Sequence, residues 1–304
     1  MEPSAEKFLR PSESVAQAMP HTDVEIGFLD HPGQPDLFLR RVRPPEPRAR
    51  LLLLHASLVH SEYYVPFALR LAAFGVESWL PDLRGHGRSA GVRGHSRSWD
   101  EVLSDVGWTF AAMSRDSDLP LLAGGESYGA LLAYSAVRRG LIAPAACLFM
   151  SPAFGIFYKP SPSVWWLLRR VGLPVFGHLR PLRVLPAEGI TRDPAVGRAL
   201  QRDSLCNRRY TLAFLLRMML EQRGLHIPDQ DWSTPALVLL SQADPITDND
   251  VSRAIFAGNP QVQVREAEGA LHSLVADQPA WAAGEVGRWL SAPYRLEGAT
   301  RADV

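Results

Sequence analysis

Short apolar runs alternate along this chain with segments of helical periodicity, and this alternation constrains the fold more than any other feature. Residues 51–54 are four consecutive leucines, which is typical of a strand buried on both faces. Candidate strands occupy residues 24–29, 37–42, 51–54, 76–80, 119–123, 146–150, 236–240 and 262–264. Candidate helices occupy residues 61–74, 98–114, 128–139, 248–257 and 278–290. The pattern predicts a mostly parallel sheet flanked by helices, opened by a hairpin of the first two strands.

Residues 155–232 break the alternation, since they contain no clear strand and several helical pieces separated by prolines. Within residues 208–222 an apolar face recurs at helical spacing, through Leu212, Leu215, Leu216, Met219 and Leu220. We therefore expect a helical cap at 155–232, inserted into a core made of 23–154 and 233–294. Residues 1–22 are expected to form an N-terminal extension and residues 295–304 a C-terminal tail.

Composition excludes some classes of function. The chain of 304 residues carries 32 basic and 32 acidic side chains, so its formal net charge of zero gives no reason to expect a nucleic-acid partner. Its two cysteines, Cys147 and Cys206, are too few for a disulfide framework and favour free thiols in a reducing compartment. Neither a signal peptide nor a membrane-spanning run is visible, so the expected location is cytoplasmic, with oligomeric state left open.

The segment Gly125-Glu126-Ser127-Tyr128-Gly129 has the pattern Gly-x-Ser-x-Gly between an apolar strand and a helix. A sharp strand-to-helix turn holds such a serine in a strained conformation, and the flanking glycines let neighbouring backbone pass closely. The pattern alone has an appreciable false-positive rate, but its context between strand and helix lowers that rate. We interpret Ser127 as a nucleophile rather than a serine in an ordinary glycine turn.

A serine nucleophile needs a base, and in proteins with this turn the chain order is serine, acid, histidine. Asp244 lies four residues past the strand at 236–240, and His272 lies in the loop after the last strand. His272 is thus the candidate base and Asp244 its partner, whereas Asp248 and Asp250 look like the start of the next helix. The alternative interpretation of His272 is an ordinary histidine of a surface loop.

A serine hydrolase also needs N–H donors for the developing oxyanion. The backbone N–H of Tyr128, directly after the nucleophile, is one candidate. The second is expected from the loop after residues 51–54, where the N–H of Ser57 is the better candidate and that of Ala56 the alternative.

Four separated stretches together resemble the monoglyceride lipase and lysophospholipase branch of the α/β-hydrolases. The likeness lies in the loop 55–64, the turn Asp82-Leu83-Arg84-Gly85-His86-Gly87-Arg88-Ser89, the serine motif, and the pair Asp244-Pro245 with Glu268-Gly269-Ala270-Leu271-His272. The resemblance implies an α/β-hydrolase fold, with an eight-stranded, mostly parallel sheet and a helical cap. It also implies a carboxylester hydrolase that needs no cofactor and acts on an ester or monoacylglycerol-like lipid.

The chain departs from this family in the loop, where the usual His-Gly is His55-Ala56. If that position requires a positive φ, alanine costs about 1 kcal/mol or shifts the loop. The apolar cap suggests an acyl-chain pocket with Trp165, Trp166, Phe214 and Met218 as candidates, although each could simply pack the cap onto the core. Transient contact of the cap with a membrane surface is possible in principle.

Two other classes of function are compatible with the sequence. An acyltransferase or thioesterase would use the same three residues, and a non-catalytic binding protein is less compatible because none of the three is lost. No metal site is expected, since no pair of histidines has zinc-ligand spacing with a third ligand nearby.

Overall fold

The computed structural model describes residues 22–31, 33–115, 117–155, 161–167, 170–171, 173–180 and 189–291. The C-terminal tail and all but the last residue of the N-terminal extension lie outside the described residues.

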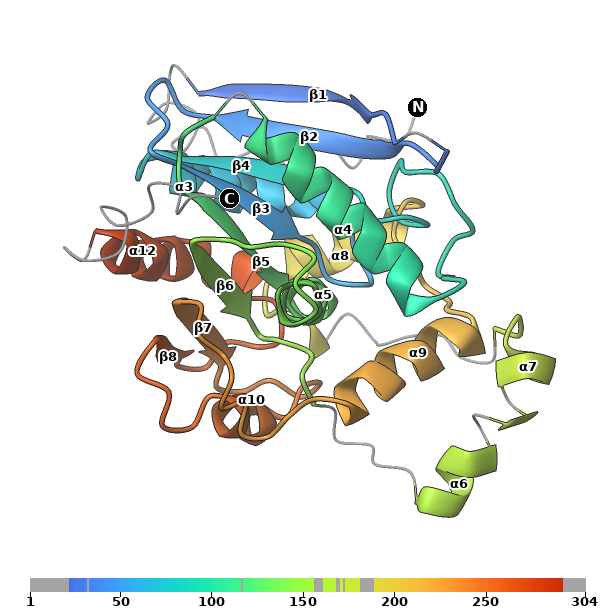
Figure 1. Cartoon of the computed structure of the whole chain (residues 1–304). Coiled ribbons are helices and arrows are strands. Elements are labelled where there is room, and N and C mark those ends of the chain that lie inside the picture. Colours follow the sequence, from blue (N-terminus) through green and yellow to red (C-terminus); the bar gives the residue numbers. More distant parts are fainter. Residues whose placement is uncertain are drawn as a thin grey trace.

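Eight strands form one sheet (Figure 1) in the order β1-β2-β4-β3-β5-β6-β7-β8. In chain order they are β1 (Asp23–Leu29), β2 (Leu37–Arg43), β3 (Ala49–Leu54), β4 (Val76–Pro81), β5 (Leu121–Glu126), β6 (Ala146–Met150), β7 (Ala236–Ser241) and β8 (Val262–Ala267). Strand β2 pairs antiparallel with both β1 and β4, and all other pairs are parallel. The predicted opening hairpin and mostly parallel eight-stranded sheet are confirmed.

Helices cover both faces of the sheet. One face packs against α3 (Val65–Ala72) and α12 (Pro279–Leu290), and the other against α4 (Trp99–Ser114), α5 (Tyr128–Arg138) and α10 (Asn249–Ile255). The alternation of side chains along β3 explains its four leucines, because Leu51 and Leu53 join the first apolar cluster and Leu52 and Leu54 the second. The strand is therefore buried on both faces, as its composition predicts.

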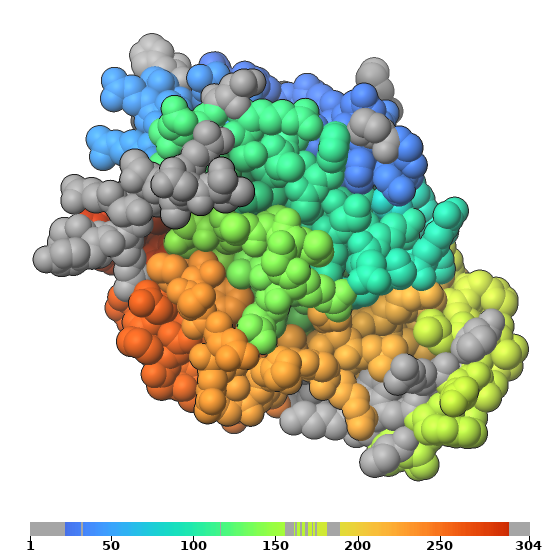
Figure 2. Space-filling view, viewed as in Figure 1, coloured from blue at the N-terminus to red at the C-terminus, as the bar shows by residue number. Residues whose placement is uncertain are grey.

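The segment between β6 and β7 is helical where it is described. It holds α6 (Pro162–Leu167), α7 (Leu173–Phe176), α8 (Pro194–Arg202) and α9 (Leu212–Arg223). Helix α9 begins later than the predicted residue 208, because the Thr211 hydroxyl caps it by accepting a hydrogen bond from the N–H of Phe214 at 3.2 Å. Helices α6 and α7 lie away from the sheet, at the edge of the molecule (Figure 2).

Strands β3 to β8 run in the same direction, so the connections after β3, β5, β7 and β8 leave the same edge of the sheet. This edge is where α/β proteins generally carry their binding sites. Strand β5 runs to Glu126, beyond the predicted end at residue 123, so Ser127 follows the strand directly. Two short helices, η1 (Ser61–Tyr64) and α11 (Leu274–Asp277), complete the loops at this edge. Of the described helices, none is long and apolar enough to cross a bilayer.

Candidate active site

Ser127 has a backbone conformation that is rare for a residue with a side chain, with φ 55° and ψ −114°. Its N–H donates to the Met150 carbonyl at 2.9 Å, which holds the turn against β6. A Cβ at Gly125 would lie 2.4 Å from the Leu54 carbonyl oxygen, and a Cβ at Gly129 would lie 2.1 Å from it. Only glycine therefore fits on either side of Ser127. The strained turn predicted from the glycine spacing is therefore present.

The imidazole of His272 and the carboxylate of Asp244 are in direct contact, with 2.8 Å between His272 Nδ1 and Asp244 Oδ2. Both side chains are buried, and Asp244 also accepts hydrogen bonds from the Thr247 hydroxyl and the Ile246 N–H. These contacts keep the imidazole oriented with Nε2 directed away from the carboxylate.

The charges of this pair stabilise each other. Burial alone would lower the pKa of His272, but the hydrogen bond and charge of Asp244, with a smaller effect of Glu126, outweigh it and raise that pKa. Burial alone would raise the pKa of Asp244, but the bonds from His272 and Thr247 outweigh it and lower that pKa. The pair therefore favours imidazolium beside carboxylate, the charge state that forms when a histidine accepts a proton.

The two rival aspartates have other contacts. The Asp248 side chain accepts the N–H groups of Asp250 and Val251 and is the N-cap of α10. The Asp250 carboxylate pairs with Arg253 at 2.6 Å. Both belong to the first turn of α10, as the sequence suggests.

The hydroxyl of Ser127 makes no hydrogen bond with His272, although both residues are described. Glu126, which precedes Ser127, is nevertheless bonded to the loop that follows His272. Ser273 Oγ donates to Glu126 Oε2 at 3.0 Å, and the Val275 N–H donates to Glu126 Oε1 at 3.3 Å. These bonds hold the loop of His272 against the turn of Ser127. Hydrogen bonds between catalytic groups often become short and well aligned only when substrate binds.

Glu126 also connects this turn to the loop after β3. The Tyr64 hydroxyl donates to Glu126 Oε2 at 2.8 Å and accepts the Ala56 N–H at 2.9 Å. Burial raises the pKa of Glu126, and the charge of His272 and the bonds from Tyr64, Val275 and Ser273 oppose that rise without cancelling it. Glu126 was not among the predicted site residues. The available signal was an acidic side chain inside the serine motif, directly after an apolar strand.

Two of the three candidate oxyanion donors are available. Within the described residues, the backbone N–H groups of Tyr128 and Ser57 have no hydrogen-bond acceptor, whereas the Ala56 N–H is occupied by Tyr64. Ser57 is therefore preferred over Ala56. Only Ser127 and Ser151 among the described non-glycine residues have a positive φ, so Ala56 occupies its position without backbone strain.

The residues proposed for substrate contact are separated. Phe214 is buried against Tyr128, with 5.1 Å between ring centroids, and Met218 packs on the same apolar cluster. Trp166 lies on α6 with 65% of its surface exposed, and the side chain of Trp165 lies outside the described residues. The structure thus places Phe214 beside the serine turn, Met218 on the apolar cluster that includes Tyr128, and Trp166 in solvent.

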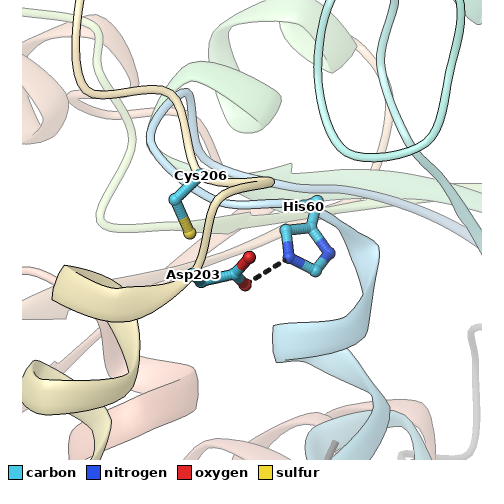
Figure 3. A group of neighbouring side chains, drawn as sticks. All are labelled: His60, Asp203 and Cys206. Atoms are coloured by element: carbon cyan, nitrogen blue, oxygen red, sulfur yellow. Dashed lines mark hydrogen bonds and ion pairs between the residues drawn. The ribbon is translucent and has the colours of Figure 1, made fainter. Parts of the chain in front are cut away.

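Within the part of the chain that the structure describes, one group of side chains has metal-ligand chemistry. It consists of His60, Asp203 and Cys206 (Figure 3), whose ligand atoms lie within 4.8 Å of one another. Because His60 is far from Asp203 and Cys206 in the sequence, the spacing of ligand residues did not reveal the group. His60 Nε2 and Asp203 Oδ2 are only 2.8 Å apart and already form a hydrogen bond. Burial raises the pKa of the Cys206 thiol to about 12, and His60 Nδ1 has no partner to orient the ring toward an ion. The group fits a hydrogen-bonded cluster better than a metal centre.

Comparison with known proteins agrees with this geometry. Residues 45–279 match the family model Hydrolase_4, described as serine aminopeptidase, S33. A monoacylglycerol lipase of Mycolicibacterium smegmatis is 26% identical over 200 residues, covering 66% of this chain and 70% of that protein. The phospholipase YtpA of Bacillus subtilis is 26% identical over 234 residues, covering 75% of this chain and 89% of that protein.

Two further matches bear on length and fold. An uncharacterized abhydrolase domain-containing protein of Dictyostelium discoideum is 28% identical over 216 residues, or 69% of this chain, and the match spans only 22% of that longer protein. A soluble variant of the monoglyceride lipase of Saccharomyces cerevisiae, solved with a substrate analogue, superposes with a TM-score of 0.77 at 18% identity, over 90% of this chain and 96% of that one.

The family match covers more than half of the chain, and the relatives support the predicted class of carboxylic ester hydrolase. Together with the eight-stranded sheet, these findings establish that the chain belongs to the Hydrolase_4 (serine aminopeptidase, S33) family of α/β-hydrolases and resembles its monoglyceride lipase branch.

Proposed function

We propose that the protein hydrolyses carboxylic esters through an acyl-enzyme on Ser127, with His272 as general base and Asp244 as its partner. The observation that carries this proposal is the buried contact of 2.8 Å between His272 Nδ1 and Asp244 Oδ2, held beside the strained turn of Ser127. A serine in that conformation, next to an oriented imidazole, has the two groups that acyl transfer requires.

In the proposed reaction, Ser127 Oγ attacks the carbonyl carbon while its proton passes to His272 Nε2. Asp244 stabilises the imidazolium, and the N–H groups of Tyr128 and Ser57 bind the negative oxygen of the tetrahedral intermediate. The ester bond then breaks as His272 gives the proton to the leaving alcohol. Water, deprotonated by the same imidazole, releases the acid and regenerates Ser127.

The proposed substrates are short-to-medium acyl esters or monoacylglycerol-like lipids. Relatives named monoacylglycerol lipase and phospholipase support a lipid ester over a peptide, although the family description names an aminopeptidase. Phe214, which packs against Tyr128, and Met218 on the same apolar cluster favour an acyl chain beside the serine.

Contact of the insertion with a lipid surface is part of the proposal. Several large apolar side chains of α6 and α7 are exposed, namely Val164, Trp166, Leu167, Val175 and Phe176. Such a cluster is unusual for a surface in water and suits the interface of a micelle or bilayer. A cytoplasmic location stays a prediction from the sequence.

Turnover of p-nitrophenyl esters of increasing acyl length tests the proposal. We expect wild-type turnover with a preference for medium chains, and loss of at least about 10⁴-fold in kcat for Ser127→Ala. Product analysis with water and alcohols both present separates hydrolysis from acyl transfer. Absence of turnover by the wild type, or unchanged turnover by Ser127→Ala, would refute it.

A further inference from the structure

An open pocket of about 310 Å³ lies beside the His60, Asp203 and Cys206 cluster, and its lining is rich in arginine. Arg93 comes from the loop after β4, Arg180 follows α7, and Arg208 and Arg209 lie between α8 and α9. Four arginines line one pocket in a chain whose formal net charge is zero. The concentration of positive charge is therefore local.

Three of these arginines donate to backbone carbonyls, which do not neutralise their charge. Arg93 donates to the Leu205 carbonyl at 3.1 Å, Arg180 to the Arg209 carbonyl at 3.3 Å, and Arg208 to the Asp203 carbonyl at 3.2 Å. Among the described residues, no carboxylate forms an ion pair with any of the four. Because a guanidinium carries five N–H donors, each retains donors for a ligand.

Asp203 is the acidic residue of the lining, and its carboxylate is directed to the cluster in Figure 3. Its Oδ2 accepts hydrogen bonds from His60 at 2.8 Å and from Tyr63 at 3.1 Å, and its Oδ1 accepts the Leu205 N–H. Burial opposes ionisation, but the bond from His60 and that of Leu205 lower the pKa of Asp203 to about 2. The carboxylate is thus ionised and fully engaged, which leaves the arginines in excess.

The pocket is connected to the candidate oxyanion loop. The Asn207 N–H donates to the Leu58 carbonyl at 2.9 Å, and the Tyr210 hydroxyl donates to the Ser57 carbonyl. Asn207 lines the pocket, and Ser57 is a proposed oxyanion donor. The pocket wall is therefore hydrogen-bonded directly to the loop that would hold the ester carbonyl.

We propose that this pocket binds a phosphate group. Guanidinium forks match phosphate oxygens in pairs, and four of them suit a group with several charged oxygens better than a single carboxylate. The pocket volume of about 310 Å³ is large enough for a phosphate with its attached glycerol. The positive lining also explains why a cation is a poor occupant of the neighbouring cluster.

The phosphate has two conceivable sources, the headgroup of an ester substrate or free phosphate that acts on the oxyanion loop. Assignment of the phosphate to a substrate headgroup rests on the proposed ester hydrolysis, whereas phosphate binding by the pocket does not. Binding is therefore measured on Ser127→Ala protein, in which hydrolysis plays no part.

Calorimetric titration of Ser127→Ala protein with glycerol 3-phosphate, inorganic phosphate and glycerol tests the binding. Both anions should bind with one-to-one stoichiometry, and glycerol should not. Adding Arg93→Gln and Arg209→Gln should weaken anion binding at least about tenfold, whereas Arg198→Gln, an exposed arginine of α8 outside the pocket, should not. Glycerol 3-phosphate binding no tighter than glycerol, or anion binding unchanged by the double substitution, would overturn the proposal.

Turnover by the wild-type protein identifies the source. A preference for 1-acylglycerol 3-phosphate over 1-acylglycerol of the same chain length, lost with Arg93→Gln/Arg209→Gln, assigns the pocket to the substrate headgroup. Equal turnover of the two esters with anion binding retained assigns it to free phosphate. If neither ester is hydrolysed, the assignment to a substrate headgroup fails. Turnover of the p-nitrophenyl esters still decides the proposed function, and the titration still decides the pocket.

Discussion

Ser273 donates a hydrogen bond to Glu126 at 3.0 Å, across 147 residues of sequence. Glu126 directly precedes the candidate nucleophile and Ser273 directly follows the candidate base. One buried carboxylate thus joins the loops of Ser127 and His272, and through the Tyr64 hydroxyl it also reaches the loop of the oxyanion donors. The relative placement of three loops depends on Glu126, which is not itself proposed to touch substrate.

Ser273→Ala should lower kcat about 10-fold with little change in KM, because the loop of His272 loses one of its attachments to the serine turn. The lost buried bond should also destabilise the fold by about 1 kcal/mol. Ser291→Ala, which removes a hydroxyl bonded to the Gly287 carbonyl at the end of α12, serves as the matched control. If kcat per folded molecule is unchanged in Ser273→Ala, the bond is structural only.

The pH dependence of kcat/KM should report His272. Its raised pKa means that the imidazole gains a proton, and stops acting as a base, at a higher pH than an ordinary histidine. Activity should therefore fall as pH decreases through a midpoint above the usual histidine value. Asp244→Asn removes the charge that raises this pKa, so the midpoint should move to lower pH and kcat should fall about 10³- to 10⁴-fold.

Asp248→Asn is the control for that substitution, since asparagine keeps the N-cap of α10. It should leave both midpoint and kcat at wild-type values. A shifted midpoint in Asp248→Asn with a normal one in Asp244→Asn would mean that the wrong aspartate has been assigned.

Gly129→Ala should destabilise the protein by at least about 2 kcal/mol, because the new Cβ would lie 2.1 Å from the Leu54 carbonyl oxygen. Gly27→Ala is the control, as its Cβ would meet no atom within 4 Å. Urea unfolding of both variants gives the comparison, and the Gly27 change should stay within about 0.5 kcal/mol of wild type. Similar stability of the two variants would contradict the close approach of β3 to the turn.

Ala56→Gly, which restores the residue usual in the resembling family, should not stabilise the loop. Since Ala56 has no positive φ and packs against the core, glycine adds freedom to the unfolded chain and removes a partly buried methyl. Thermal unfolding should show a loss of about 0.5–1 kcal/mol with activity retained. A gain in stability would mean that the loop prefers a glycine conformation after all.

Local patterns predicted much of the fold. The leucines at 51–54 indicated a strand buried on both faces, and the glycines around Ser127 indicated a close approach that the Leu54 carbonyl supplies. The order of Ser127, Asp244 and His272 after successive strands pointed to one edge of the sheet, where His272 and Asp244 are in contact. Each of these inferences uses periodicity or chain order, which are properties of sequence.

Other features depend on contacts between distant residues and escaped prediction. Glu126 gains its role from Tyr64 and Ser273, and the arginine pocket is assembled from three separate segments. The short helix α11 has too few residues for a periodic signal, whereas η1 lies within the helix predicted at 61–74. The exposure of Trp166 is likewise a consequence of where α6 lies, which its apolar sequence does not reveal.

The central claim is that Ser127 is activated by His272, and labelling with a fluorophosphonate tests it most directly. The reagent reacts with activated serines, and peptide mapping by mass spectrometry identifies the residue that carries the phosphonate. We predict a single adduct on Ser127, absent in Ser127→Ala and formed at least about 10²-fold more slowly in His272→Ala. An adduct on a different serine, or labelling of Ser127 at an equal rate without the imidazole, would contradict the proposed mechanism.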